Sequence, residues 1–272
     1  MGLIPVRANG FTLIEVVMVI VISGIIAGML AVFIRQPVDA YFDASRRAAL
    51  TDTADAALRR MSRDIRKALP NSVRSPSNQC IEFIPTKTGG RYRADVNGSG
   101  HGDVLDFALA DSQFDMFGLN GDLPADQQIS PNDVIAVYNL GFAGADAYSE
   151  DNTSRVSAVG AGSLVNETKI TIVAKRFPLE SASNRFYVIP GEEKVVSFVC
   201  HGGKLFRNSN YAYTVSCPTT GGVQLAQNVN SCQFTYNGSD LQRNALVQMT
   251  VQLSKDGETV TLYHEAHVNN TP

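Results

Sequence analysis

The sequence predicts an α+β fold in which one long N-terminal helix precedes an antiparallel β-sheet body. Three observations predict this order. An apolar stretch fills residues 11–34, a helical pattern of apolar residues continues to Leu69, and short alternating segments bounded by Gly, Pro, Asn and Asp follow Pro70. A run of strands after a run of helix is typical of the α+β class.

The composition agrees with a folded chain that has one unusually apolar region. Of the 272 residues, 44% are hydrophobic and 18% are charged, which excludes an intrinsically disordered protein. The net charge is −3, and residues 70–272 hold fourteen basic and twenty acidic side chains. Proteins that coat nucleic acid carry a basic excess, so we expect no nucleic-acid partner.

The first element, residues 11–34, is a candidate transmembrane helix whose one charged residue is Glu15. Its length suffices to cross a hydrocarbon core of about 30 Å and exceeds the ~7–15 apolar residues of a cleaved secretory signal. A carboxylate within such a span costs up to about 3 kcal/mol on insertion scales, so Glu15 is expected to have a cationic partner. If the chain were cut near Phe11, the free α-amine of a neighbouring subunit would supply that cation.

The second element is an amphipathic extension of the same helix over residues 35–69. Apolar residues recur at spacings of three and four through Leu58, Met61 and Ile65. The basic residues between 59 and 67 lie off this stripe, and we interpret them as a solvated face; a docking face for an acidic partner is the alternative. Pro37 favours a kink, and Pro70 predicts the end of the helix.

The remaining elements are short strands that follow Pro70. The candidates are Cys80–Ile84, Val104–Leu109, Val134–Asn139, Lys169–Lys175, Phe186–Ile189, Val195–His201, Lys204–Arg207, Tyr211–Val215, Cys232–Tyr236, Leu246–Ser254 and Thr259–Val268. Asp256-Gly257 predicts a hairpin between the last two, and Gly202-Gly203 predicts a second hairpin. Residues 110–132 and 140–166 are rich in Gly, Ala, Asp, Ser and Asn and are predicted to be surface loops.

Four cysteines, Cys80, Cys200, Cys217 and Cys232, are candidates for two structural disulfides. The preferred pairing is Cys200 with Cys217, across the Gly202-Gly203 hairpin region, which leaves Cys80 with Cys232. Cys217 with Cys232 is the main alternative. No C-x-x-C is present, which argues against a zinc ribbon or a thioredoxin-like site.

Residues 95–106 allow two interpretations. Asp95, Asn97, Ser99, Asp103 and Asp106 stand at the positions from which one loop can wrap a calcium ion, and Gly100 is at the sixth position. Position twelve is Asp rather than Glu, however, and no helix is predicted to follow. We therefore prefer a flexible Gly-rich loop that leads into a strand, and we expect no cofactor.

No pattern in the sequence supports an enzyme. The four histidines, at positions 101, 201, 264 and 267, do not cluster, and we interpret them as surface or satisfied side chains. The sequence lacks the G-x-S-x-G, phosphate-loop and H-E-x-x-H motifs of common hydrolases and nucleotide-binding proteins. A non-enzymatic protein is the expectation.

The segment Gly10-Phe11-Thr12-Leu13-Ile14-Glu15-Val16 resembles the class III signal of type IV pilins and type II secretion pseudopilins. The resemblance implies that Gly10 is the last leader residue and that prepilin peptidase cuts after it. Phe11 then becomes the N-methylated first residue, and Glu15 serves subunit register and recruitment.

The same resemblance divides the chain into a leader (1–10), a transmembrane and filament-core helix (11–34), its amphipathic extension (35–69) and a periplasmic pilin body (70–272). It implies a single-pass inner-membrane protein that assembles with other major and minor pilins and an inner-membrane platform. Three diffuse motifs resemble J-type minor pseudopilins and prepilin-like proteins of the mannose-sensitive haemagglutinin (MSHA) pilus. They are Arg60–Ile65 before Ala-Leu-Pro, Gly102–Phe107 and His267–Asn270.

Overall fold

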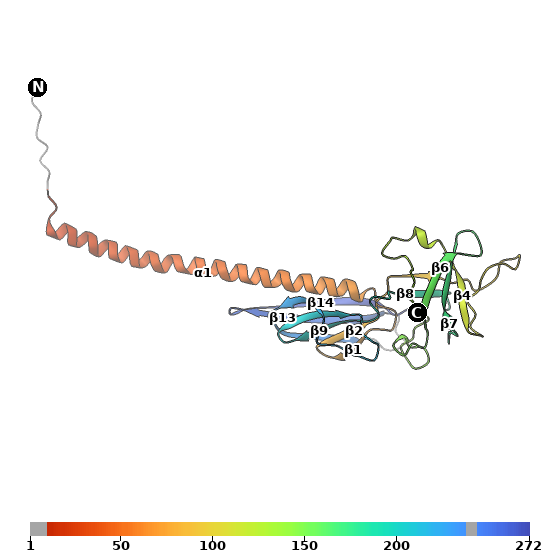
Figure 1. Cartoon of the computed structure of the whole chain (residues 1–272). Helices are drawn as coiled ribbons and strands as arrows, with labels where there is room; N and C mark the ends of the chain where they lie inside the picture. The colour runs from red at the N-terminus through yellow and green to blue at the C-terminus, as the bar shows by residue number, and fades with distance from the viewer. Residues whose placement is uncertain (1–9, 238–243) are drawn as a thin grey trace, which may run out of the picture. The chain divides into compact units, whose positions relative to one another are not determined.

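The computed structural model describes residues 10–237 and 244–272, and it shows one long helix followed by antiparallel sheets (Figure 1). The α+β prediction is therefore confirmed. The chain divides into two compact units, with the boundary between Ala49 and Leu50. The elements are α1 (Leu13–Ile65), β1 (Arg74–Ser77), β2 (Cys80–Phe83), β3 (Thr88–Arg91), β4 (Asp111–Phe117), β5 (Val134–Val137), β6 (Thr153–Ala161), β7 (Glu167–Lys175), β8 (Arg185–Ile189), β9 (Val196–His201), β10 (Lys204–Ser209), β11 (Val223–Gln227), β12 (Val229–Asn237), β13 (Asn244–Lys255) and β14 (Glu258–Asn269), with short 3-10 turns at Asn120–Asp122 and Ala147–Ser149.

Helix α1 is one uninterrupted helix that includes Pro37. It ends at Ile65, four residues before the predicted end at Leu69. The reason is a competing set of backbone hydrogen bonds: the Leu69 amide donates to Ile84 and the Thr86 amide donates to Lys67. Residues 66–69 therefore join the chain that leaves β2 and do not extend the helix.

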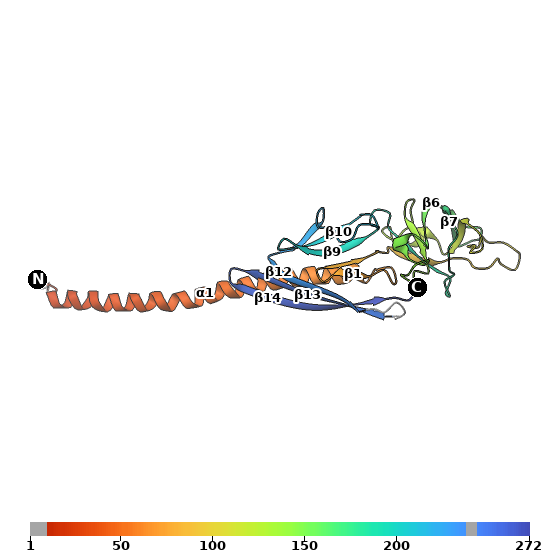
Figure 2. The ribbon, with the colours of Figure 1, turned by 90° about the horizontal axis from the view of Figure 1, so that it is seen from below.

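The C-terminal part of α1 shares one hydrophobic core with two sheets. One sheet has the order β1-β2-β9-β10-β11 and the other has the order β12-β13-β14. Figure 2 shows β12, β13 and β14 side by side. From the helix, Leu50, Ala54, Leu58, Met61 and Ile65 enter this core, and from the sheets it receives Phe83, Phe198, Phe234, Val247, Met249, Val251 and Leu253. The predicted stripe through Leu58, Met61 and Ile65 is confirmed as the buried face.

A second core lies inside a six-stranded sheet with the order β3-β8-β5-β6-β7-β4. The two end strands meet, because a bridge joins Tyr92 to Met116 and the Arg93 amide donates to the Asp115 carbonyl at 2.8 Å. This contact closes the sheet into a small antiparallel barrel. Its interior is filled by Phe114, Ile135, Ile170, Phe186, Val188 and neighbouring apolar side chains.

The barrel is an insertion into the first sheet. Strands β2 and β9 are hydrogen-bonded neighbours, and Phe83 at the end of β2 is the register partner of Val196 at the start of β9. All six barrel strands lie within residues 84–195, between these two partners. The chain thus leaves the helix-bearing part and returns to it at the same place.

Most of the predicted strands are present, but two are wrong. Residues 104–109 form an irregular bend, in which the Asp106 carboxylate accepts from the Ala108 amide, and residues 211–215 are held by side-chain contacts instead of a sheet. The two predicted surface loops are also wrong in part, since 110–132 contains β4 and 140–166 contains β6. Both strands gain their hydrogen bonds from barrel neighbours, which local composition does not reveal.

Both predicted hairpins are confirmed. Asp256 and Gly257 have φ values of 50° and 85°, and Gly202 and Gly203 have 57° and 73°. Two consecutive positive φ angles define the tight turn whose twist matches antiparallel strands. The turns join β13 to β14 and β9 to β10.

Candidate assembly site

The N-terminus of α1 is capped by its own residues. The Thr12 amide and the Thr12 hydroxyl each donate to Glu15 Oε2 at 3.0 Å, and the Glu15 amide donates to Thr12 Oγ1 at 3.3 Å. This reciprocal pair is a capping box, which satisfies amides that have no partner within a helix. The Thr-x-x-Glu spacing was the signal for it in the sequence, and the sequence analysis missed it.

The same contacts place the Glu15 carboxylate beside the predicted cleavage point. Thr12 follows Phe11 directly, so the oxygen that Thr12 binds is held one residue from the amine that cleavage after Gly10 would expose. The described residues show no hydrogen bond to Glu15 Oε1. A negative charge at the N-terminal end of a helix also interacts favourably with the helix dipole.

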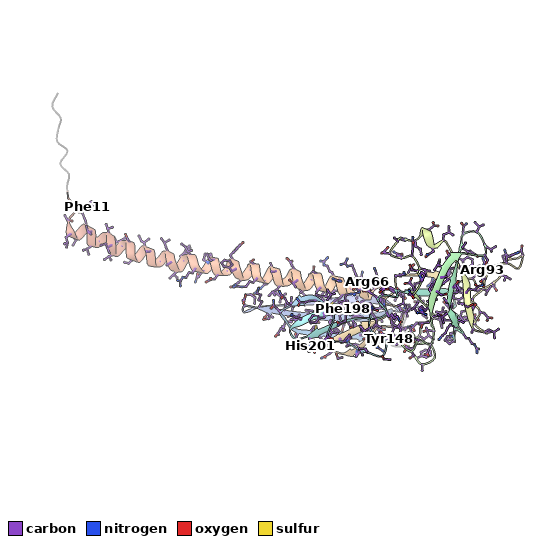
Figure 3. All side chains as sticks on the ribbon, viewed as in Figure 1. Phe11, Arg66, Arg93, Tyr148, Phe198 and His201 are labelled. Carbon is purple, nitrogen blue, oxygen red and sulfur yellow. A yellow bond between two sulfur atoms is a disulfide. The ribbon has the colours of Figure 1, made fainter. Side chains whose placement is uncertain are left out.

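The helix that follows exposes its apolar side chains. None of the most apolar window of α1 is buried in the chain, and this one helix is long and apolar enough to cross a membrane. Phe11 is 86% exposed and Phe33 is 78% exposed (Figure 3 labels Phe11). Large apolar surfaces of this kind need a non-aqueous environment or other protein to cover them.

Comparison with known families agrees with this geometry. The model of the prokaryotic N-terminal methylation motif matches residues 6–31. This match supports a type IV pilin-like protein. A prepilin-type N-terminus is consistent with a single-pass membrane anchor, cleavage by prepilin peptidase and assembly with other pilins. No curated protein and no solved structure matches the chain.

The four cysteines form two disulfides, as predicted, but both predicted pairings are wrong. Cys80 binds Cys217 and Cys200 binds Cys232. Cys200 lies on β9 and Cys232 on β12, so this bond joins the two sheets of the helix-bearing core. Proximity to the Gly202-Gly203 turn suggested Cys217 as the partner of Cys200, but residues 211–217 turn away to meet Cys80.

The contacts around Cys217 centre on a buried carboxylate that the sequence analysis missed. Glu82 has no exposed surface, and it accepts from Arg74 Nε at 2.6 Å, the Tyr211 hydroxyl at 2.7 Å and the Cys217 amide at 3.0 Å. Burial raises the pKa of Tyr211, and the neighbouring Glu82 carboxylate adds to the rise. Arg74 also stacks on Tyr148, 3.6 Å from the ring centroid. Because the Glu82 carboxylate is paired with Arg74 and accepts two further hydrogen bonds, we interpret these residues as a structural cluster that holds residues 211–217 on the sheet.

The structure does not bring the candidate calcium ligands together. Asn97 Oδ1 accepts from the amides of Ser99 and His101, and Asp103 binds Lys169 Nζ at 3.0 Å. Asp106 accepts from the Ala108 amide. Among residues 10–237 and 244–272, no three His, Cys, Asp or Glu side chains gather as a metal site would require.

The basic residues near the end of α1 are exposed. Arg59 forms an exposed ion pair with Asp55 at 2.7 Å, and Arg60, Arg63, Arg66 and Lys67 face solvent. Arg66 is labelled in Figure 3. The exposure agrees with a solvated face.

Proposed function

We propose that this chain is a non-enzymatic minor subunit of an MSHA-type type IV pilus, similar to the biogenesis protein MshO. Prepilin peptidase cuts after Gly10, Phe11 is methylated, and the subunit enters the filament at or near its tip, where it helps to start assembly. Before assembly it is anchored in the inner membrane with residues 70–272 in the periplasm. The inner-membrane platform and the other pilins are its partners.

The observation that carries this proposal is the combination at the helix N-terminus. The motif match at residues 6–31, the Glu15 carboxylate held at the helix start and the uncovered apolar helix together support a subunit that packs through this helix. Two disulfides support exposure of the body to an oxidising compartment such as the periplasm. The MSHA assignment rests on the diffuse sequence motifs described above.

Two alternatives share the same N-terminus. In one, the chain is a minor pseudopilin of type II secretion, and in the other it is a tip adhesin whose outer loops bind a ligand. The barrel does not distinguish these two alternatives, because it would be exposed on the subunit in either case. Deletion of the chain separates them: loss of surface pili supports the pilus role, loss of protein secretion supports the secretion role, and pili that no longer attach support the adhesin role.

Mass spectrometry of the mature chain from its native host tests the processing step. We expect the first residue to be Phe11 with a methylated amine. A mature chain that begins at Met1, or at an unmethylated residue elsewhere, would contradict the proposal.

Exchange of Glu15 tests assembly directly. Glu15→Ala should leave cleavage and insertion intact, because the apolar span is unchanged, and should reduce filament number by at least about tenfold. Glu192→Ala, at an exposed glutamate of the body, is the matched control and should leave filaments unchanged. Normal filament number in the Glu15→Ala strain would count against the proposal.

A further inference from the structure

The open edges of the sheets differ in how they are protected. Strand β1 is four residues long, contains Pro76 and has an irregular register with β2. Strand β11 is five residues long and is also irregular in its pairing. In the barrel, β3 and β4 meet each other through the Tyr92–Met116 bridge. Short length, proline, irregularity and closure are the ordinary ways in which proteins prevent strand edges from pairing with other chains.

The edge strand β12 is covered as well. The Phe234 amide of β12 donates to the Asn78 carbonyl, between β1 and β2, at 2.7 Å. The edge of β12 that does not face β13 therefore meets the first sheet. Every sheet edge in the described residues except β14 is thus blunted, closed or covered.

Strand β14 has none of these protections. It is twelve residues long, and its register with β13 is regular over all twelve pairs, from Asn244–Asn269 to Lys255–Glu258. Its sequence, Glu258 to Asn269, contains no Pro, Gly, Lys or Arg. In the described part of the chain its backbone pairs with β13 alone. Figure 2 shows β14 at the margin of its sheet.

The side chains of β14 indicate that this edge is only partly covered. On the inner face Val260 and Leu262 are half-buried, whereas their β13 register partners Leu253 and Val251 are fully buried. On the outer face Tyr263 is 56% exposed and hydrogen-bonds Glu265. A further strand beside β14 would extend the apolar inner face and complete the burial of Val260 and Leu262.

We propose that the β14 edge binds an extended segment of a different subunit of the same filament, which adds a strand to this sheet. The segment alternates apolar residues, which cover Val260 and Leu262, with basic or neutral residues, which face Glu265. Main-chain hydrogen bonds supply affinity and the alternating side chains supply specificity in this mode of recognition. The β14 strand carries two carboxylates and neither Lys nor Arg, so β14 of a second copy would pair one acidic strand with another. The identity of the partner as a filament subunit rests on the proposed function.

Photo-cross-linking in the native host tests the pairing. A photoreactive residue is placed at Thr261 or Tyr263 of the full-length chain, and at Ser231 or Gln233 as controls. Ser231 and Gln233 lie on β12, on the same face and in the same cross-strand rows as the two test positions. Pairing predicts that 261 and 263 cross-link to residues two apart in one segment of another subunit, and that 231 and 233 do not. Cross-links to a second copy, to scattered sites, or equally from all four positions would overturn the proposal.

A second variant pair tests the consequence for assembly. Thr261→Lys with Tyr263→Lys places charged side chains at the edge, which oppose pairing with a further strand, and Ser231→Lys with Gln233→Lys adds the same charges away from the edge. We expect about tenfold fewer filaments for the first pair, which corresponds to ~1.4 kcal/mol, and less than about twofold for the second. If the first pair assembles normally while Glu15→Ala does not, the edge proposal fails and the proposed function stands. If Glu15→Ala also assembles normally, the proposed function fails, and the cross-linking result alone decides the pairing.

Discussion

The two ends of helix α1 differ in what stabilises them. Residues before Ala49 include a long apolar run whose side chains are all exposed, and Met29 is 68% exposed. Residues from Leu50 onward place every third or fourth side chain in the core, and Met61 has no exposed surface. One continuous helix thus contains a part that its own chain covers and a part that its own chain does not.

The difference shows that burial in the protein and apolar character are separate properties of a helix. The C-terminal part has the amphipathic pattern of a helix packed on a sheet. The N-terminal part is apolar on all sides, as in a helix surrounded by lipid or by other helices. The first depends on tertiary packing within the chain, and the second depends on an environment outside it.

Removal of a disulfide should have the largest effect on the part of the molecule that its own chain stabilises. Cys200→Ala with Cys232→Ala opens a link between residues 32 apart, which should lower the free energy of unfolding of the body by about 4 kcal/mol in the chain-entropy description. Membrane insertion should be unchanged. Denaturant unfolding of the full chain in detergent, followed by tyrosine fluorescence, measures the loss. A body of unchanged stability would mean that packing alone fixes the two sheets.

A matched pair of methionine exchanges should separate the two parts of the helix. Met61→Ala removes a fully buried side chain and should lower the free energy of unfolding by about 3 kcal/mol. Met29→Ala removes an exposed side chain of the span and should leave the body unaffected. The same denaturant titration gives both values. Equal losses of unfolding free energy in Met61→Ala and Met29→Ala would contradict the difference between the two parts of the helix.

Loss of the capping box should have a smaller effect, confined to the first turn of the helix. Thr12→Val removes the hydroxyl that exchanges hydrogen bonds with Glu15 and should destabilise the helix start by about 1 kcal/mol. Thr12→Ser keeps the hydroxyl and should restore the original behaviour. Amide hydrogen exchange at residues 13–16, in detergent, reports the fraying. Unchanged exchange in Thr12→Val would show that the cap is not formed in solution.

Acid should lower the stability of the body, because a buried carboxylate there is held in its charged form. Burial raises the pKa of Asp115, but hydrogen bonds from Ser163 and from the Asp103 amide, together with Lys169, outweigh it and hold the pKa below its ordinary value. A lowered folded-state pKa means that this stabilisation is present above the ordinary value and is lost as the pH falls through the folded-state pKa. Unfolding free energies between pH 6 and pH 2, at intervals of about one unit, should fall at the acidic end. Asp115→Asn should reduce that slope, and an identical slope would exclude Asp115 as its source.

The part of the fold that depends on local pattern could be predicted from the sequence. The apolar run, the stripe through Leu58 and Met61, and the Asp256-Gly257 turn each act over a few residues, and each is present in the structure. The barrel could not be predicted in this way. Strand β6 contains Ser, Ala and Gly at positions where strands usually carry branched residues, and it becomes a strand because β5 and β7 pair with it.

The candidate site shows the same division. Gly10, Phe11 and Glu15 lie within six consecutive residues, so a short motif was enough to predict them as a site. The disulfide partners are far apart in the sequence, since Cys80 and Cys217 are separated by 137 positions. Their pairing depends on the route of residues 211–217, which the buried Glu82 fixes through the Tyr211 hydroxyl and the Cys217 amide. A side-chain acceptor of this kind has no signature in the local sequence.

The position of the barrel has a consequence for how such a protein can change over evolution. Because the barrel begins and ends at two paired residues, Phe83 and Val196, the chain could in principle be rejoined there by a short turn. Gene segments encoding residues 84–195 could therefore be exchanged, enlarged or lost while the C-terminal part of α1 and its sheets keep their geometry. The barrel and the helix-bearing sheets are in this sense modular, and each can diverge at its own rate.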